Sequence, residues 1–456
     1  MSHVFRALLS GAYSLVWTAA RPLLRRHKRL REGFAERLVP EDWSGPANGA
    51  GKPRTDVWLQ AASGGEAYLV WELLEHLAEA WEAKDRDETG TLRVLTTTWT
   101  RQGLDVLLKM AAKLEETHPW LSVRATFFPL DAPGLMAKAL EQARPRVVGL
   151  LETELWPGLM LACRKQGVPY LILNGRMTEK SLRNYLRLEA TGFWNDMPPE
   201  HVCAISKADA ARFARLFGAE RVETVPNIKF DRAAAAAGNT VSTELRALLP
   251  SGNHAQTVLL ASVREEEEQA LLGVVRALQP EATVIIAPRH MHRVKAWQTL
   301  LDTGNRPCLL RSRQEGAFPD GSLVIWDTFG ELGQLYQLAD AVFVGGSLAP
   351  LGGQNILEPL ALGKIPCTGP SLENFAWALD ASAEGAHDSL EALGLLRRGQ
   401  DAEAVTALLR EQLRTLNDSE DASQAVRLRF QNWLAPRLGG SARCARRLLK
   451  LLDGGI

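Results

Sequence analysis

Short apolar runs alternate with amphipathic helical patterns along most of this chain, and that alternation constrains the fold more than any other feature. The runs are apolar at successive positions, so both faces of each strand are buried, as in a parallel sheet covered by helices on both sides. Helical patterns such as Glu66–Ala80 and Leu135–Ala143 lie between the runs. The predicted strands are Val57–Ala61, Arg93–Thr97, Ala125–Pro129, Val147–Leu151, Tyr170–Leu173, Val202–Ile205, Val258–Ala261, Thr283–Ala287, Cys308–Leu310, Leu323–Trp326 and Ala341–Val344.

The alternation is interrupted between Asp231 and Gln256, where large apolar residues are scarce. A chain of 456 residues is also long for a single hydrophobic core. We therefore predict an α/β protein with two Rossmann-like, doubly wound domains that face a cleft. Residues 32–230 form the first domain, 231–256 the linker region, and 257–456 the second domain with the C-terminal helices. Ligands of such sheets bind beyond the carboxyl ends of the strands.

The charge balance and the cysteine content exclude some classes of protein. Lys plus Arg and Asp plus Glu number 53 each, and this balance argues against a wholesale nucleic-acid binder. The five cysteines are far apart and form no CxxC motif or Cys/His cluster. We expect a reduced, cytoplasmic setting in which the cysteines are small core hydrophobes, and we expect neither a metal nor a cofactor.

Residues 1–31 carry an unusual N-terminal pattern. No charge occurs from Ala7 to Ala20, a stretch that spans about 21 Å as a helix, short of a hydrocarbon core of about 30 Å. A cluster of cations follows, which anionic lipid would attract. The pattern predicts a membrane anchor that lies on or barely spans the bilayer, with the body on the cytoplasmic side. The alternative is an ordinary first helix packed on the body. The cations are Arg21, Arg25, Arg26, Lys28, Arg29 and Arg31.

A glycine-rich stretch follows the predicted strand Ala341–Val344. Glycines let a backbone approach a ligand closely, and a helix that begins near Asn355 would point its free N–H groups at a phosphate. Glu358, in the first turn of that helix, could accept hydrogen bonds from ribose hydroxyls. The alternative is a glycine turn followed by an acid that complements the helix dipole. The glycines are Gly345, Gly346, Gly352 and Gly353.

Two other strand ends of the second half carry candidate ligand contacts. "IIAPRHMHR" ends a buried strand in Pro288 and Arg289, and an arginine there can pair with a phosphate. "WDTFGELGQLYQLAD" places Phe329, Gly330 and Glu331 at a helix start, where backbone N–H groups could meet a phosphate or a base edge.

In the first half of the chain, acidic residues follow two of the predicted strands. Glu66 opens a helix after "SGG", a position suited to a general base, although an acid there also complements the helix dipole. "VVGLLETELWPGL" runs from an apolar strand into Glu152 and Glu154, which together line a strand end. Lys229 in "NIKFD" lies among apolar residues, so burial would penalise its charge and an acidic or phosphate partner is implied.

Several of these motifs, in order, resemble one family. They are "SGGE", "LETELWP", "LNGRMTEKS", "NIKFD", "PRH", "GELGQLYQLADAVFVGGS" and "GGQNILEPLALGK". The family is that of the Kdo transferases, which add 3-deoxy-D-manno-octulosonic acid (Kdo) to lipid A precursors in lipopolysaccharide biosynthesis. The resemblance covers nearly the whole chain. It implies a GT-B glycosyltransferase that takes Kdo from CMP-Kdo, inverts the anomeric carbon and works at the cytoplasmic face of the inner membrane.

The resemblance also implies roles for particular residues. Glu66 matches the base that deprotonates the acceptor hydroxyl, and Glu152 and Lys229 match residues assigned to transition-state stabilisation. The residues that match the CMP-Kdo site are Pro288, Arg289, Phe329, Gly330, Glu331, Gly346, Ser347, Asn355, Ile356, Leu357 and Glu358. Relative to the family's usual pattern, this chain has Gln354 in place of His and Phe329 in place of Met.

Two other functions remain open from the residues. One is a different GT-B glycosyltransferase, or a sugar epimerase, that uses a UDP-sugar. The other is a membrane-tethered module that binds a nucleotide sugar without turnover, although the acids at Glu66 and Glu152 argue against it.

Overall fold

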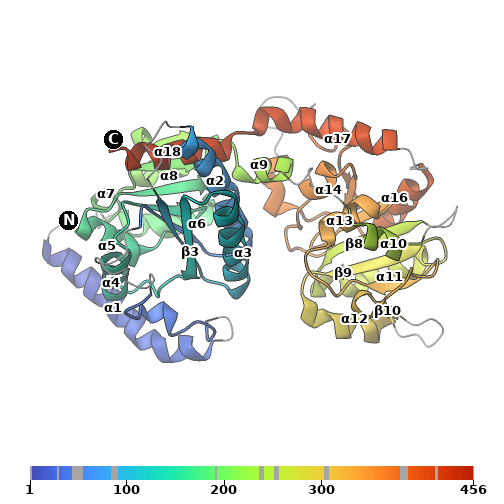
Figure 1. The fold of residues 1–456 in the computed structure, drawn as a ribbon, viewed down its shortest axis with the longest axis horizontal. Coiled ribbons are helices and arrows are strands. Elements are labelled where there is room, and N and C mark those ends of the chain that lie inside the picture. The colour runs from blue at the N-terminus through green and yellow to red at the C-terminus, as the bar shows by residue number, and fades with distance from the viewer. Residues whose placement is uncertain are drawn as a thin grey trace. The chain divides into compact units, whose positions relative to one another are not determined.

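The computed structural model describes residues 3–27, 30–43, 55–83, 91–153, 155–189, 193–235, 241–250, 256–301, 308–379, 389–415 and 420–454. The chain forms two compact units (Figure 1). Unit 1 comprises Met1–Arg232 and Arg437–Ile456, and unit 2 comprises Ala233–Pro436. The sequence interpretation kept residues 257–456 together, whereas the contacts return Arg437–Ile456 to unit 1.

Unit 1 contains a seven-stranded parallel sheet in the order β3-β2-β1-β4-β5-β6-β7. β1 pairs with β2 on one side and β4 on the other, with Gln60 opposite Thr97 and Leu150. All carboxyl ends therefore lie at one edge of the sheet. The strands are β1 Val57–Ala61, β2 Leu92–Thr98, β3 Leu121–Phe127, β4 Val147–Leu151, β5 Tyr170–Gly175, β6 His201–Ala204 and β7 Val222–Thr224.

Helices cover both faces of this sheet. They are α1 His3–Arg26, α2 Gly64–Glu82, α3 Arg101–Thr117, α4 Pro133–Ala143, α5 Pro157–Gln166, α6 Glu179–Leu186, α7 Phe193–Asp196, α8 Lys207–Phe217, α9 Ile228–Ala235 and α18 Gly440–Leu452. Short 3₁₀ turns occur at η1 Glu36–Leu38 and η3 Ala219–Arg221. The strands predicted at Val57–Ala61 and Val147–Leu151 are confirmed at both ends.

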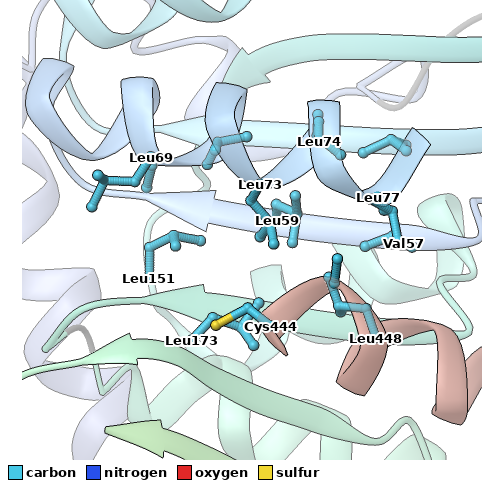
Figure 2. Close-up of a cluster of buried hydrophobic side chains, with 14 of the residues drawn as sticks. Val57, Leu59, Leu69, Leu73, Leu74, Leu77, Leu151, Leu173, Cys444 and Leu448 are labelled. Carbon is cyan, nitrogen blue, oxygen red and sulfur yellow. The ribbon is translucent and has the colours of Figure 1, made fainter. Parts of the chain in front are cut away.

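The C-terminal helix α18 completes one core of unit 1 (Figure 2). Leu448 of α18 packs with Leu59 and Leu173, and all three side chains are buried. Gly149 of β4 makes this packing possible, because a Cβ there would lie 2.7 Å from Leu59 and 2.9 Å from Leu173. Cys444 is buried in the same cluster as a free thiol, which fits the prediction that the cysteines are core hydrophobes.

The N-terminal helix α1 has two different faces. On one face the Tyr13 hydroxyl donates a 2.9 Å hydrogen bond to Asp131, which follows β3 and is fully buried. The other face exposes Leu15, Val16 and Leu23. The contact at Tyr13 agrees with the alternative of a first helix packed on the body, and the membrane anchor stays a prediction. Among the described residues, no helix is both long and apolar enough to cross a membrane.

Unit 2 contains a second seven-stranded parallel sheet, in the order β10-β11-β9-β8-β12-β13-β14. The strands are β8 Thr257–Val263, β9 Thr283–Pro288, β10 Cys308–Leu310, β11 Leu323–Ile325, β12 Ala341–Val344, β13 Pro366–Thr368 and β14 Arg397–Arg398. Its helices are α10 Thr243–Leu248, α11 Glu268–Leu278, α12 Val294–Leu301, α13 Leu332–Leu338, α14 Leu357–Ala361, α15 Ala376–Leu379, α16 Ala402–Thr415 and α17 Glu420–Leu434. Two doubly wound α/β units were predicted, and the two parallel sheets confirm them.

Candidate functional site

Glu66 and Glu152 follow neighbouring strands of unit 1. Glu66 lies in the first turn of α2, five residues after β1, and Glu152 follows β4 directly. Because β1 and β4 are adjacent and parallel, both acids belong to the same edge of the sheet. This is the edge at which such sheets bind ligands.

The Glu66 carboxyl is held by the cap of its own helix. One oxygen accepts a 2.7 Å hydrogen bond from the Ala62 amide, and the other accepts a 3.0 Å bond from the Ser63 hydroxyl. Ser63 in turn caps α2 by accepting from the Glu66 amide at 3.4 Å. Glu66 therefore takes part in the N-terminal cap of its own helix. The cap therefore fixes the orientation of the Glu66 carboxyl.

Glu152 forms an ion pair with Lys229. The Lys229 Nζ lies 2.5 Å from the Glu152 Oε1, and only 14% of the Glu152 side chain is exposed. The predicted acidic partner of Lys229 is thus confirmed. Glu152 itself has a φ of 58°, a left-handed conformation that costs energy for a residue with a side chain. This backbone conformation turns the chain directly after β4, at the position that carries the acid.

Two asparagines fix the helix that carries Lys229. Asn174 at the end of β5 has a φ of 55° and accepts a 2.9 Å bond from the Ile228 amide. Asn227 accepts a 3.0 Å bond from the Lys229 amide. Both asparagines are buried. The start of α9 is therefore tied to the strand next to β4, which explains why Lys229 reaches Glu152.

The same "NIKFD" motif holds the C-terminal helix. Asp231 accepts 2.7 Å hydrogen bonds from the amides of Gly439 and Ser441, at the N-terminus of α18. A carboxylate at this helix end also complements the helix dipole. The sequence interpretation gave Asp231 no role, because its partners lie more than 200 positions further along the chain.

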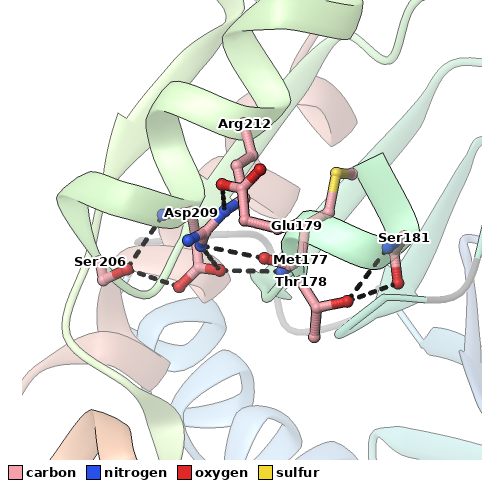
Figure 3. A network of polar contacts seen from close by, with 7 residues as sticks. All are labelled: Met177, Thr178, Glu179, Ser181, Ser206, Asp209 and Arg212. Carbon is pink, nitrogen blue, oxygen red and sulfur yellow. Dashed lines mark hydrogen bonds and ion pairs between the residues drawn. The ribbon is translucent and has the colours of Figure 1, made fainter. Parts of the chain in front are cut away.

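The "LNGRMTEKS" segment is held by a polar network around Asp209 (Figure 3). Asp209 accepts a 2.8 Å bond from the Met177 amide and pairs with the Ser206 hydroxyl at 2.5 Å. Arg212 donates to Glu179 at 2.7 Å and to the Met177 carbonyl at 3.0 Å. This part of the motif holds the turn after β5 in place.

Aromatic residues flank the acidic strand ends. Trp156 of "ETELWP" stacks on Trp99, which follows β2, with ring centroids 5.3 Å apart. Phe128, after β3, packs against both rings. Glu154, which was expected beside Glu152, lies outside the described residues.

In unit 2 the glycine loop after β12 is occupied by Glu267. The Glu267 carboxyl accepts hydrogen bonds from the amides of Gly346, Ser347, Leu348 and Arg264. Burial raises the pKa of Glu267 to about 7, and these hydrogen bonds oppose the rise. The amides of Gly346 and Ser347, predicted to contact the donor, therefore bind the protein's own carboxyl.

Glycine is required at this loop for packing. A Cβ at Gly345 would lie 2.6 Å from a Glu267 oxygen and 2.7 Å from the Ser262 carbonyl. Ser347 is fully buried and its hydroxyl bridges the Val344 carbonyl and the Gly369 amide, at 2.7 and 2.8 Å. Sequence reasoning missed Glu267, because its partners Ser347 and Gly346 lie far along the chain.

The "QNILEP" segment leads into the short helix α14, which begins two residues after Asn355. α14 contains the five residues Leu357–Ala361, and the Asn355 side chain accepts a 3.1 Å bond from the Leu357 amide. Ile356 and Leu357 are buried in the core, whereas Asn355 is exposed and Glu358 is half-buried. Burial, with the nearby Glu358 charge, raises the pKa of Tyr336 on α13.

The loop after β11 is held by Glu331. Its carboxyl accepts hydrogen bonds from Arg311 at 3.1 Å, Trp326 at 2.9 Å and Thr328 at 2.6 Å. The preceding Gly330 has a φ of 87°, and Phe329 is 74% exposed at the tip of the loop. Glu331 thus shapes the loop, and Phe329 is its accessible side chain.

Arg289 follows β9, between the strands that carry the other loops. Its amide donates a 2.8 Å bond to the Val263 carbonyl at the end of β8, and its side chain is half-buried. Pro288 is buried. Because β11, β9, β8 and β12 are consecutive in the sheet, Arg289 and the loops at Phe329 and Gly346 share one edge of unit 2.

One group of residues could in principle hold a metal. Within the described part of the chain, His201, Cys203 and Glu223 bring three possible ligand atoms within 4.8 Å of one another. Arg447 binds both Glu223 oxygens, at 2.6 and 2.8 Å, and so competes for that carboxylate. The group also lies on β6 and β7, away from Glu66 and Glu152.

The chain is similar to known proteins over most of its length. Residues 29–232 match the family model described as 3-Deoxy-D-manno-octulosonic-acid transferase (kdotransferase). The chain is 29% identical to the 3-deoxy-D-manno-octulosonic acid transferase of Bordetella pertussis, over 84% of this chain and 86% of that protein. It is 27% identical to the enzyme of the same name from Haemophilus influenzae, over 76% and 77% of the two chains.

The fold is similar to that of a solved structure. The glycosyltransferase from Rickettsia africae matches 88% of this chain and 98% of its own, with a TM-score of 0.52 and 12% identity. Together with the two parallel sheets, this likeness identifies the GT-B fold that was predicted. In its motifs, its relatives and its fold, the chain is similar to the 3-deoxy-D-manno-octulosonic-acid transferases.

Proposed function

We propose that this protein is an inverting glycosyltransferase that moves Kdo from CMP-Kdo to a lipid A precursor. The observation that carries the proposal is the strand-end group of unit 1, where Glu66 shares an edge with the Glu152–Lys229 ion pair. The relatives support the sugar, since the B. pertussis and H. influenzae proteins are both named Kdo transferases.

In the proposed reaction, Glu66 accepts the proton of an acceptor hydroxyl as that oxygen attacks the anomeric carbon of Kdo. One carbon–oxygen bond forms, the bond from the anomeric carbon to the CMP phosphate oxygen breaks, and CMP leaves with the electron pair. A single displacement of this kind inverts the anomeric centre. A positioned base contributes about 10²–10⁴ in rate.

Lys229 and Glu152 act as a pair in this proposal. Lys229 supplies a positive charge close to the reacting centre, and Glu152 fixes the position of the ammonium group through the 2.5 Å contact. A preorganised charge stabilises a transition state because it needs no reorganisation during the reaction.

In unit 2, the groups proposed to meet the nucleotide are those that the loops leave accessible. Arg289 can pair with the phosphate, Glu358 can accept hydrogen bonds from the ribose, and exposed Phe329 can contact the donor. The buried members of the predicted set, such as Ile356 and Leu357, support the loop from the core.

We propose that α1 attaches the enzyme to the inner membrane at its cytoplasmic face. Leu15 and Leu23 are 73% and 72% exposed, and Val16 lies on the same face. An amphipathic helix of this kind lies in the plane of a bilayer with its apolar side chains in the acyl boundary. The Tyr13–Asp131 bond would then link the attached helix to the body.

The proposed function is tested by incubating the purified protein with CMP-Kdo and a tetra-acylated lipid A precursor, then measuring the mass of the lipid. We expect a gain that equals one or more Kdo residues. Parallel reactions with UDP-sugars serve as the donor control. No gain with CMP-Kdo, or a gain from a UDP-sugar alone, would refute the proposal.

A further inference from the structure

A basic groove lies between α1 and the segment that follows it in unit 1. We call it the arginine groove and define it by Arg21, Arg25, Arg26 and Arg31. Its volume is about 1280 Å³, and Glu36 is its acidic lining residue. Phe34 and Leu38 add apolar surface. The groove is therefore large enough for more than an inorganic ion and carries an excess of positive charge.

The four arginines differ from others nearby in their pairing. Among the described residues, no carboxylate lies within 4.0 Å of the guanidinium groups of Arg21, Arg25, Arg26 or Arg31, and the Nε of Arg21 is buried without a hydrogen-bond partner. By contrast, Arg101 contacts both Glu32 and Asp105. Clustered like charges without counter-charges repel one another, so an anionic ligand would be favoured there.

The groove is fixed to the sheet edge that carries Glu66. Arg37, next to Glu36, donates to the carbonyls of Trp99 at 2.7 Å and Phe128 at 3.3 Å, and accepts from the Leu130 amide at 3.0 Å. Trp99 and Phe128 follow β2 and β3, the first and second strands beyond β1. Two strand spacings amount to roughly 10 Å. A single sugar headgroup of two rings can therefore span from the Glu66 end toward the groove.

Guanidinium groups bind phosphate through paired N–H bonds, and they lose less hydration than ammonium groups when they do so. Apolar Phe34 and Leu38 suit the carbon skeleton next to such a phosphate. We propose that the arginine groove binds a phosphate group on the sugar headgroup of the lipid acceptor, so that an acceptor hydroxyl is directed to Glu66. The assignment rests on the proposed function, because it takes a phosphorylated lipid as the acceptor.

The test uses the full-length Arg25→Gln/Arg26→Gln protein, in which both altered side chains are exposed. The matched control is Arg443→Gln/Arg446→Gln, which removes two exposed arginines from α18 in the same unit. Transfer is measured in nonionic micelles with a phosphorylated lipid A precursor and with the same lipid after phosphatase treatment. We expect the groove variant to lose roughly 10- to 100-fold in kcat/KM on the phosphorylated lipid. It should match wild type on the dephosphorylated lipid.

Three results would overturn the assignment. They are an equal loss on both lipids, no loss on either, and a wild-type enzyme that does not distinguish the lipids. The phosphate groups of the bilayer are the other ligand that the groove could bind. Sedimentation with phosphatidylglycerol vesicles tests that alternative. If the groove variant loses vesicle binding and keeps wild-type kinetics in micelles, the groove serves the bilayer and the acceptor assignment is wrong.

Binding of the phosphorylated lipid, measured by calorimetry in the same micelles, separates this inference from the proposed function. If wild type binds the lipid and makes no product, the proposed transfer fails. Weaker binding by the groove variant alone would still support the groove. Equal binding by wild type, groove variant and control would refute the groove whether or not transfer occurs.

Discussion

Both units place acids where parallel strands end, yet the surroundings of these acids differ. In unit 1, Glu152 pairs with the ammonium group of Lys229, and Glu66 uses its helix cap for orientation. In unit 2, Glu267 accepts bonds from several backbone amides, most of them after β12, and Glu331 accepts bonds from the side chains of Arg311, Trp326 and Thr328. Similar positions in two similar sheets therefore hold acids with different roles.

This difference indicates that the role of an acid at a strand end can be inferred from the groups that donate hydrogen bonds to it. A carboxyl that accepts hydrogen bonds from several donors of one loop fixes that loop, as Glu267, after β8, does for the turn after β12. In unit 1 the helix cap orients the Glu66 carboxyl and Lys229 orients the Glu152 carboxyl. We infer that the acids of unit 1 carry the chemistry, whereas the acids of unit 2 shape the loops that hold the donor.

The largest effect is expected for Glu66→Gln. The amide keeps the size of the side chain and cannot take a proton, so turnover should fall at least about 100-fold. CMP affinity should not change. The matched control is Glu79→Gln, an exposed acid on the same helix, which should behave as wild type. Near-normal transfer by the Glu66→Gln protein would move the base elsewhere, with Glu152 and Glu154 the next candidates.

Removing the cation of unit 1 should have the next largest effect. Lys229→Met deletes a charged hydrogen bond, which contributes about 1.5–3 kcal/mol, so kcat should fall roughly 10- to 100-fold. Steady-state kinetics at saturating donor measure this change. Lys165→Met, an exposed lysine at the end of α5, is the control. An unchanged kcat in the Lys229→Met protein would remove the pair from the mechanism.

The accessible polar groups of unit 2 should affect binding instead. Arg289→Ala and Glu358→Ala should each weaken CMP binding by roughly 10- to 100-fold, because each removes a charged hydrogen-bond partner. Calorimetry gives the affinities, and the exposed Arg276→Ala serves as control. If both variants bind CMP as tightly as wild type does, the donor site has been assigned to the wrong residues.

The comparison also predicts that membrane attachment belongs to unit 1. Leu15→Glu/Leu23→Glu places charge on the exposed face of α1 and should lower sedimentation with membranes about tenfold or more, since burying a leucine contributes about 1.5–3 kcal/mol. Leu428→Glu, at another exposed leucine in unit 2, should have no such effect. Deleting residues 1–31 should likewise release a protein that still binds CMP. Unchanged sedimentation of that truncated protein at high salt would exclude α1 as the anchor.

The smallest effect concerns the loop acid Glu267. Burial raises its pKa from 4.5 to about 7 in the folded protein, so the folded state holds a proton that the unfolded state releases. Its contribution to stability is therefore full below about pH 4.5 and is lost as the pH rises through 7. Glu267→Gln should flatten the fall in unfolding free energy by at most about 1.4 kcal/mol per pH unit. Denaturation at pH 5.5, 6.5 and 7.5 measures it, and an unchanged slope would contradict the assignment.

Much of the fold followed from local patterns. The runs at Val57–Ala61 and Val147–Leu151 have the apolar residues of buried strands, and the strands begin and end there. The short strands β13 and β14 have three and two residues, too few for a periodic signal. The return of α18 to unit 1 depends on long-range contacts, such as Asp231 with Ser441, that no local pattern encodes.

The sequence predicted only part of the candidate site. An acid after a strand predicted the location of Glu152, and the apolar setting of Lys229 predicted an acidic or phosphate partner, of which the structure has the acidic one. Glu267 was missed because its partners, Gly346 and Ser347, lie about 80 positions away and only the folded loop brings them together. The arginine groove was seen as a run of cations, since its concave shape depends on how α1 and residues 31–38 fold back on each other.

The central claim is that the acids of unit 1 carry the chemistry and the polar groups of unit 2 bind the donor. Its most direct test compares Glu66→Gln and Arg289→Ala in one kinetic experiment. Both kcat and the KM for CMP-Kdo are measured with the same lipid acceptor. We predict that Glu66→Gln lowers kcat at least about 100-fold with little change in donor KM. Arg289→Ala should raise donor KM roughly 10- to 100-fold and retain most of kcat at saturating donor. If both substitutions change the same parameter, the acids of unit 1 and the donor groups of unit 2 do not have separate roles, and the account is wrong.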